Sequence, residues 1–395
     1  MAPSGNGTMP VITTMRPALV GRLNERQVLR VIQDRGPLSR AEVARECGLS
    51  PPTVSKAVAS LLRSGLLEEA DAPETARGRP APRLRLASAT AQVLGVTIDG
   101  GHCEVVSAGL DGELHADLVT VPTPTSYPAL LDALEAAART LIARPGVTTL
   151  GLGVSLPGLV DYRKGCGVLS PNLPITNGHA PAADLAERLG IDCTLLQESH
   201  ALCLAEREYG LARGLDDFAM LDVGTGVGLG VMSGGRLVTG HSGLAGEIGH
   251  ITAVADGGRA CGCGNRGCLE TVASDRALAL RASEKLGRDV DVDEVIDLLT
   301  AGAVDLADEL RAAVTYLAVG VAAVLNLFNP ATLFIHTRLF ETDPALFAEV
   351  VRQAGARALP PAFADCRIVP AKGSKRQGAV AGIVRRLTDA VARDA

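Results

Sequence analysis

The chain has 395 residues, of which 47% are apolar and 21% are charged, and it contains no Trp. This composition supplies ample core material and excludes collagen-like and wholly disordered chains. The scarcity of aromatic residues argues against a protein that stacks the bases of single-stranded nucleic acid. The length indicates more than one domain.

The formal net charge is −6, but the charge is divided unevenly along the chain. Residues 1–90 carry 13 Lys and Arg against 8 Asp and Glu, whereas the remainder carries 25 against 36. This division indicates a basic nucleic-acid-binding module attached to an acidic body. Nine cysteines, an odd number, and the lack of a signal-peptide pattern predict a cytoplasmic protein with reduced thiols. The most apolar run, residues 312–327, predicts a buried helix and no membrane span.

The N-terminal region has the pattern of a helix-turn-helix. Residues 1–22 lack periodicity and are expected to form a flexible tail. Residues 23–88 are expected to form a winged helix-turn-helix domain, because two short helical patterns flank a glycine-containing turn. Ser39 is predicted to cap a helix over residues 40–47, and Ser50 to cap the next one, which ends near residue 64.

Operator DNA would meet the start of that last helix in its major groove, and a basic wing would follow in the minor groove. Hydroxyl groups, ammonium groups and guanidinium groups can bond to base edges and phosphates. The candidate DNA-binding residues are Ser39, Arg40, Pro52, Thr53, Ser55, Lys56, Arg77 and Arg79. The alternative is a small helical bundle with a solvated basic loop.

The body is predicted to be an α/β structure with two lobes and a cleft between them. Two segments, residues 93–106 and 219–237, each show a strand, a glycine-rich turn and a second strand, and helical patterns alternate with them. The first lobe is assigned to residues 89–200 and the second to residues 201–375. A C-terminal helix over residues 376–393 is expected to return to the first lobe.

One short segment carries a pattern typical of a metal site. His250 precedes three cysteines, Cys261, Cys263 and Cys268, that are interleaved with glycines. Three thiols and one imidazole suit a tetrahedral, structural Zn2+ with no position left for water. The alternative is a set of unligated buried cysteines. Two carboxylates, Glu247 and Glu270, flank the cluster and could accept hydrogen bonds from a hydroxyl-bearing ligand.

The stretch GEIGH…CGCGNRGCLE, Gly246 to Glu270, closely resembles the ROK family of repressors and sugar kinases, in its repressor branch. The resemblance implies an actin-like (ribonuclease H-like) sugar-kinase fold of two α/β lobes after the winged helix-turn-helix, with a sugar bound in the cleft. It also implies sugar contacts and zinc ligands. The sugar contacts are Asn172, Glu247, His250 and Glu270; the zinc ligands are His250, Cys261, Cys263 and Cys268.

Three departures from the kinase pattern indicate a sensor that is not an enzyme. Glu198-Ser199-His200 stands where the family's kinases have Glu-Asn-Asp, so His200 is predicted at the position of the catalytic base. The first phosphate motif ends in Glu104 where Lys is expected, and His336-Thr337 replaces paired glycines.

These features predict a sugar-responsive transcriptional regulator, most simply a repressor of carbohydrate uptake or metabolism genes. A homodimer, or a dimer of dimers, would bind a palindromic operator. The alternatives are a sugar kinase with an appended DNA-binding domain and a repressor controlled by a protein partner.

Overall fold

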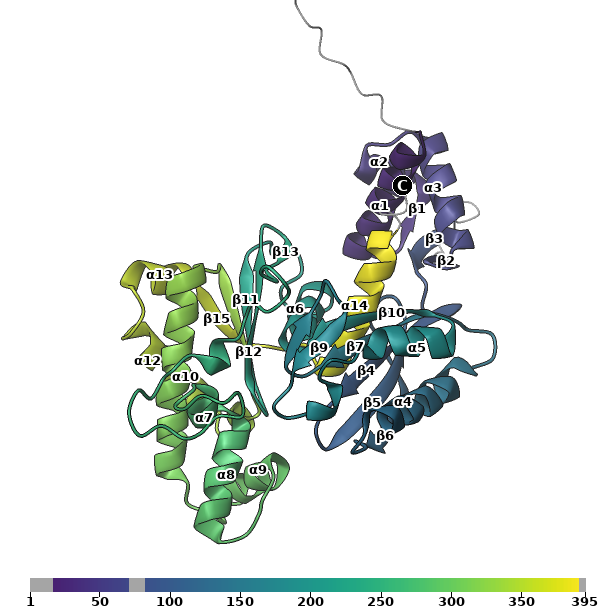
Figure 1. The fold of residues 1–395 in the computed structure, drawn as a ribbon. Helices are drawn as coiled ribbons and strands as arrows, with labels where there is room; N and C mark the ends of the chain where they lie inside the picture. The colour runs from purple at the N-terminus through teal and green to yellow at the C-terminus, as the bar shows by residue number, and fades with distance from the viewer. Residues whose placement is uncertain (1–16, 71–81, 391–395) are drawn as a thin grey trace, which may run out of the picture. The chain divides into compact units, whose positions relative to one another are not determined.

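The computed structural model describes residues 17–70 and 82–390 and divides into two compact units (Figure 1). One unit takes the residues up to Thr90 together with those from Arg385, and the other takes Ala91–Val384. Two of the predicted DNA-binding residues, Arg77 and Arg79, lie outside the described residues.

In its described residues up to Thr90, the N-terminal unit contains three helices and a small antiparallel sheet. The helices are α1 (Pro17–Arg35), α2 (Arg40–Cys47) and α3 (Pro51–Arg63), and the strands are β1 (Leu38–Ser39), β2 (Leu67–Ala70) and β3 (Arg83–Leu86). The strand order is β1-β3-β2. The predicted caps are confirmed: the Ser39 and Ser50 side chains accept hydrogen bonds from backbone N–H groups three residues on. Val28, Val54 and Leu84 are fully buried in this unit.

The prediction of a tail over residues 1–22 is wrong for its last six residues. Helix α1 begins at Pro17. Proline fixes a backbone angle that suits the first helical turn, and the Ala-Leu-Val run that follows it continues the helix. The lack of apolar periodicity before Leu23 hid this helix start in the sequence.

The first lobe of the body is a five-stranded sheet of order β10-β7-β4-β5-β6. Its strands are β4 (Ala91–Ile98), β5 (His102–Ala108), β6 (Leu114–Pro122), β7 (Thr148–Leu156) and β10 (Asp192–Gln197). Helices α4 (Tyr127–Ile142) and α5 (Pro181–Leu189) cover one face (Figure 1), and a small hairpin and a short turn lie between β7 and α5. These elements are β8 (Leu159–Asp161), β9 (Cys166–Leu169) and η1 (Pro174–Thr176).

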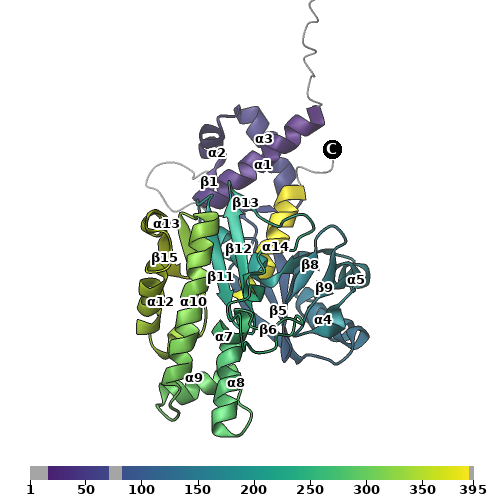
Figure 2. The ribbon, with the colours of Figure 1, turned by 60° about the vertical axis from the view of Figure 1, so that its left-hand side comes forward.

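The second lobe has a sheet of order β13-β12-β11-β14-β15. Its strands are β11 (Phe218–Val223), β12 (Val227–Ser233), β13 (Arg236–Leu237), β14 (Thr332–His336) and β15 (Arg367–Pro370). Its helical elements are η2 (Ile248–His250), α7 (Glu270–Ala273), α8 (Asp275–Leu286), α9 (Val292–Thr300), α10 (Ala307–Phe328), α11 (Leu339–Thr342), α12 (Ala345–Gly355) and α13 (Pro360–Asp365). Figure 2 shows α10 and α12 beside this sheet.

Helix α10 is long and apolar enough to cross a membrane by length and composition, but half of its most apolar window is buried in the protein. Leu317, Val321 and Leu325 are fully buried against the strands of the second lobe. The prediction of a buried helix is therefore confirmed.

Two helices do not follow the lobe boundaries that the sequence predicts. Helix α6 (Glu198–Glu208) crosses the boundary drawn at residue 200, because its backbone continues as one helix from its cap at Gln197 and it packs on strands of both sheets. Helix α14 (Lys375–Ala390) was expected to return to the first lobe as a whole. Its last turns instead group with the N-terminal unit, where Asp389 forms an ion pair with Arg26.

The first sheet contacts α14 through glycines. A Cβ atom on Gly153 would lie 1.9 Å from the Ala379 carbonyl oxygen, and one on Gly151 would lie 2.8 Å from the Ile383 side chain. Only glycine therefore allows the helix to approach the strands this closely. Ile383 is fully buried in the contact.

Candidate functional site

A polar cavity lies in the body and is lined by residues from both lobes. The four predicted ligand-binding residues, Asn172, Glu247, His250 and Glu270, all line it. They come from the loop before η1, from η2 with its cap, and from the first residue of α7. The fold thus brings together residues that are almost one hundred positions apart in the sequence.

Two glycines hold the Glu247–His250 segment against strand β12. A Cβ on Gly246 would lie 2.0 Å from the Leu229 carbonyl oxygen, and one on Gly249 would lie 2.2 Å from the Val227 carbonyl oxygen. Gly246 also has a φ of +98°, which side chains disfavour. This close approach aims the Glu247 and His250 side chains at the cavity.

The carboxylates of the cavity are held by neighbouring donors. Glu247 Oε1 accepts a hydrogen bond from Gln197 Nε2 at 3.3 Å, and Glu270 Oε2 accepts one from the Val227 backbone N–H at 3.2 Å. Burial, and secondly the charge of Glu270, raises the pKa of Glu247 to about 7. A carboxyl group with this pKa can either donate to or accept from a hydroxyl group near neutral pH.

His250 faces two ways. Its Nδ1 lies 3.6 Å from Cys261 Sγ, and its Nε2 lies 3.8 Å from Glu247 Oε2. One ring nitrogen therefore points to the thiols while the other points to a carboxylate of the cavity.

The three thiols and the imidazole form one cluster. The ligand atoms of His250, Cys261, Cys263 and Cys268 all lie within 4.8 Å of one another. Cys263 Sγ and Cys268 Sγ are 3.7 Å apart. A tetrahedral zinc ion would place two sulfurs about 3.8 Å apart and a sulfur and an imidazole nitrogen about 3.5 Å apart, from its usual bond lengths. The donor set and its spacing fit such an ion.

Asn172 contacts the second lobe. Its Oδ1 accepts a hydrogen bond from Arg276, which lies in the first turn of α8. Its backbone oxygen would lie 3.1 Å from a Cβ on Gly100, in the turn between β4 and β5. Asn172 therefore joins the glycine turn of the first lobe to a helix of the second.

His200 is not among the residues that line the cavity, and its place at a catalytic-base position stays a prediction. The ring is fully buried, and its Nδ1 bonds to the Tyr162 hydroxyl at 2.9 Å. Burial lowers the pKa of His200 to about 4, although a backbone hydrogen bond to Ala245 acts in the opposite direction. The acidic group of this segment that faces the cavity is Glu198, because helical geometry turns position 200 away from position 198.

Sequence reasoning missed several cavity residues. Gln197, Glu198, Asp222 and Lys375 line the cavity beside the predicted set. Lys375 forms ion pairs with Glu198 and, at 3.6 Å, with Asp222. Its position after Gly373 and Ser374 carries no recognisable motif, so only the fold reveals it.

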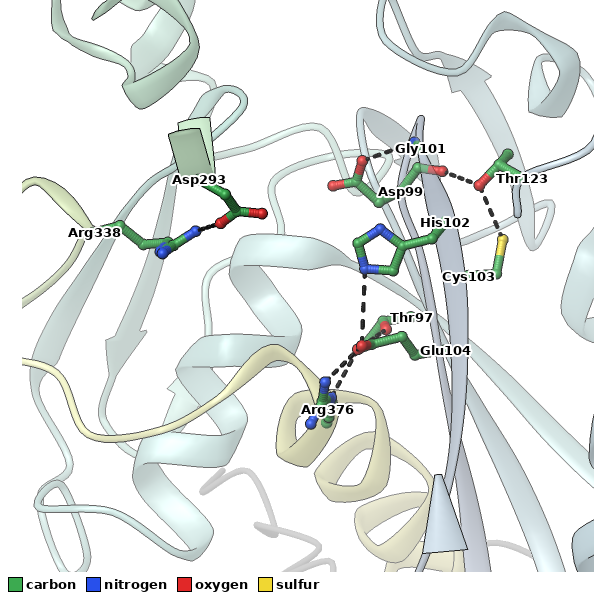
Figure 3. Close-up of polar contacts among 10 residues, drawn as sticks. All are labelled: Thr97, Asp99, Gly101, His102, Cys103, Glu104, Thr123, Asp293, Arg338 and Arg376. Atoms are coloured by element: carbon green, nitrogen blue, oxygen red, sulfur yellow. Dashed lines mark hydrogen bonds and ion pairs between the residues drawn. The ribbon is translucent and has the colours of Figure 1, made fainter. Parts of the chain in front are cut away.

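The other altered positions make contacts within the protein, and Figure 3 shows the contact between Glu104 and Arg376. Glu104 accepts two hydrogen bonds from Arg376, at 2.7 and 2.5 Å, and this contact lowers the pKa of the carboxyl group. His336 Nδ1 lies 2.8 Å from Asp222 Oδ1, and the Thr337 hydroxyl donates to Asp275 at 2.9 Å. Both residues line a second cavity in the second lobe, together with Arg338, whose side chain pairs with Asp293.

The predicted DNA-binding residues that the structure describes divide into two groups. The Ser39 and Thr53 hydroxyls take part in helix caps, since Ser39 accepts from the Glu42 N–H and Thr53 bonds to Ser50 at 2.8 Å. Arg40 is paired with Glu69 at 2.9 Å. The second group stays exposed on α3 and comprises Pro52, Ser55 and Lys56.

The exposed face of α3 extends further than predicted. Ala59 and Arg63 are also exposed, and they follow Ser55 and Lys56 at intervals that bring them to the same side of the helix. The helical period of the exposed positions could have identified them from the sequence.

The winged helix-turn-helix unit and the two-lobed body with its polar cavity define a DNA-binding protein whose body has a sugar-kinase fold. The chain belongs to the ROK family, which matches residues 93–385, and the MarR family matches residues 22–78. The resemblance seen in the sequence and the predicted fold class are both confirmed.

Relatives match over most of the chain. The DNA-binding transcriptional dual regulator NagC of Escherichia coli is 31% identical over 362 residues, or 86% of each chain. The xylose repressor of Bacillus subtilis is 25% identical and covers 86% of this chain and 88% of its own. The crystal structure of a ROK family transcriptional regulator, a homologue of the E. coli MLC protein, covers 95% of this chain and 98% of its own, with a TM-score of 0.79 and 24% identity. A ROK family glucokinase from Streptomyces griseus covers 75% and 99%, with a TM-score of 0.65 and 22% identity.

Proposed function

We propose that this protein is a sugar-responsive transcriptional repressor that binds a sugar in the body's cavity without phosphorylating it. The observation that carries this proposal is the convergence of Asn172, Glu247, His250 and Glu270 on one cavity, in a chain that also has an exposed reading helix, α3. The names of its relatives, which include an N-acetylglucosamine repressor and xylose repressors, support it. The protein would act in the cytoplasm.

The cavity suits a polyhydroxyl ligand. A sugar that leaves water must replace its hydrogen bonds with fixed partners, and carboxylates, an amide and an imidazole supply them. Glu247 and Glu270 would accept from sugar hydroxyls, and His250 would contact a hydroxyl through Nε2. The cavity has no Trp to stack on a sugar ring, because the chain contains none.

A structural zinc ion held by His250, Cys261, Cys263 and Cys268 would stabilise this arrangement. The ion would crosslink η2 to the loop before α7, so it would position Glu247 and Glu270, which lie next to its ligands. The ligand atoms within 4.8 Å of one another support this role. With four protein ligands the metal would be structural.

On the DNA, the exposed face of α3 would enter the major groove. Pro52, Ser55 and Lys56 would contact base edges and phosphates there, and Arg77 and Arg79 would reach the minor groove. Arg40 would leave Glu69 to bind a phosphate, while Ser39 would act through its cap. A homodimer, or a dimer of dimers, would place two such helices on a palindromic operator.

Helix α14 would connect the two activities. It begins at Lys375, in the cavity, and its last turns belong to the DNA-binding unit, where Asp389 pairs with Arg26. A sugar that favours one arrangement of the lobes would act on α14 at one end and change DNA binding at the other. The coupling requires different sugar affinities in the two arrangements.

A sugar kinase with an appended DNA-binding unit is the second candidate. The Glu198 carboxylate in the cavity favours it, since a carboxylate can act as a general base. The ion pair with Lys375 argues against this role, because it occupies the carboxylate.

Calorimetric titration with a panel of free and phosphorylated sugars, paired with a coupled ATP-consumption assay, tests the proposal. We expect one sugar to bind with a 1:1 ratio, Glu247→Gln to weaken its binding at least tenfold, and no ATP to be consumed. ATP consumption that depends on the bound sugar would establish the kinase. Failure of every sugar to bind would favour control by a protein partner.

A further inference from the structure

The first residue of α14 places an ammonium group inside a cluster of carboxylates. Lys375 Nζ forms an ion pair with Glu198 Oε1 and lies 3.6 Å from Asp222 Oδ2. Glu198 begins α6, and Asp222 lies near the end of β11, so three separate elements meet at this nitrogen. All three side chains line the cavity.

The charge on this lysine is held in place by its surroundings. Burial alone would lower its pKa, but the carboxylates of Asp222 and Glu198 raise the pKa well above its ordinary value, and Asp99 acts in the same direction. Asp222 is held on its other side, where Oδ1 lies 2.8 Å from His336 Nδ1. The ammonium group therefore neutralises negative charge that Glu198 and Asp222 would otherwise carry in the cavity.

The ammonium group of Lys375 lies beside a glycine-rich turn. A Cβ on Gly224, in the glycine-rich turn after β11, would lie 3.5 Å from Lys375 Nζ. Carboxylate oxygens beside a glycine turn are the surroundings in which a hard divalent cation binds and bridges to phosphate oxygens. Phosphoryl transfer depends on such a cation to neutralise the phosphates.

We propose that Lys375 is a built-in counter-ion that excludes a divalent metal ion from the Glu198 and Asp222 carboxylates. The ammonium group of the lysine neutralises the carboxylates with a single positive charge. Unlike a metal ion, it has no open coordination position at which a phosphate oxygen could bind. Metal-bound nucleotide therefore finds no cation site in this cavity. This inference goes beyond the proposed function, because it holds whether or not a sugar controls DNA binding.

Titration of the full-length protein with MgCl2 tests the inference, since Mg2+ prefers oxygen ligands and does not compete for the thiolates. We expect no saturable binding to the wild type at millimolar Mg2+. Lys375→Met should bind one Mg2+ per chain, at least tenfold more tightly than any site of the wild type. Lys375→Arg keeps the cation and should exclude Mg2+. Lys372→Met removes a lysine three residues away and is the matched control.

Thermal unfolding in MgCl2 and in EDTA keeps the test decisive if Lys375→Met is unstable. The unpaired carboxylates should lower its midpoint in EDTA, and Mg2+ should restore part of the loss in this variant alone. A wild type that binds Mg2+ as tightly as Lys375→Met would overturn the proposal. So would a Lys375→Met protein that neither binds Mg2+ nor gains stability from it.

Discussion

The helix caps of the N-terminal unit bond to atoms three residues away, whereas two contacts of the cavity join residues that are more than one hundred positions apart. Ser39 bonds to Glu42 and Ser50 to Thr53, but Asn172 bonds to Arg276 and Lys375 pairs with Glu198. Local bonds fix a helix and leave its exposed face free to read DNA. Long-range bonds make the cavity depend on how the lobes are arranged, which is what a ligand sensor requires. We therefore expect single substitutions to change either DNA binding or sugar binding without changing the other.

The largest difference between the effects on sugar binding and on DNA binding is expected when a zinc ligand is substituted. Cys268→Ser removes a fully buried thiol of the cluster, so we expect loss of bound zinc and a fall in sugar affinity of about 100-fold, since outer contacts of metal sites alone are worth about 10- to 100-fold. DNA affinity should not change. Metal analysis and calorimetry measure the first two quantities, and Cys366→Ser is the control. Full sugar affinity without zinc would show that the metal does not position Glu247 and Glu270.

The buried His200 should make the stability of the body depend on pH. Its pKa is about 4 in the folded protein and about 6.5 when unfolded, so the unfolded chain binds the proton more tightly. The stabilisation is complete above pH 6.5 and falls as the pH drops towards 4, by roughly 3 kcal/mol in total. Denaturant unfolding across this range should show the loss in the wild type.

His200→Gln should remove this part of the pH dependence, whereas His102→Gln, at an exposed position, should keep it. Equal pH profiles for the wild type and His200→Gln would mean that the ring is open to protonation in the folded protein.

Loss of one exposed cation on α3 should have a moderate effect on DNA binding alone. Lys56→Ala should weaken binding by about 1 kcal/mol and reduce the slope of log affinity against log salt by about one. Lys164→Ala, in the body, is the control. Anisotropy titrations at several salt concentrations give both quantities, and an unchanged slope would place Lys56 away from the phosphates.

The smallest effect is expected from a helix cap. Ser39→Ala should destabilise the N-terminal unit by about 1 kcal/mol, because the α2 capping box is lost. Sugar affinity should not change. A loss of DNA affinity with no change in the unfolding midpoint would instead show direct contact between Ser39 and DNA.

The same contrast explains what the sequence could predict. The caps, the turn and the boundaries of α2 and α3 follow from neighbouring residues, and so does the clustering of Cys261, Cys263 and Cys268. The position of His200 could not be predicted, because it depends on which side of α6 faces the cavity. Lys375 could not be predicted, since it reaches the cavity only when α14 packs on Gly151 and Gly153.

Sugar-dependent binding of operator DNA tests the central claim most directly. Fluorescence anisotropy would give the Kd for an operator fragment with and without the sugar found by calorimetry, for the wild type and Glu247→Gln. The account predicts a shift of about 5- to 150-fold in the wild type, the usual range of allosteric coupling, and almost none in the variant at the same sugar concentration. If the Kd of the wild type for operator DNA stays the same when the sugar is bound in the cavity, the account is contradicted.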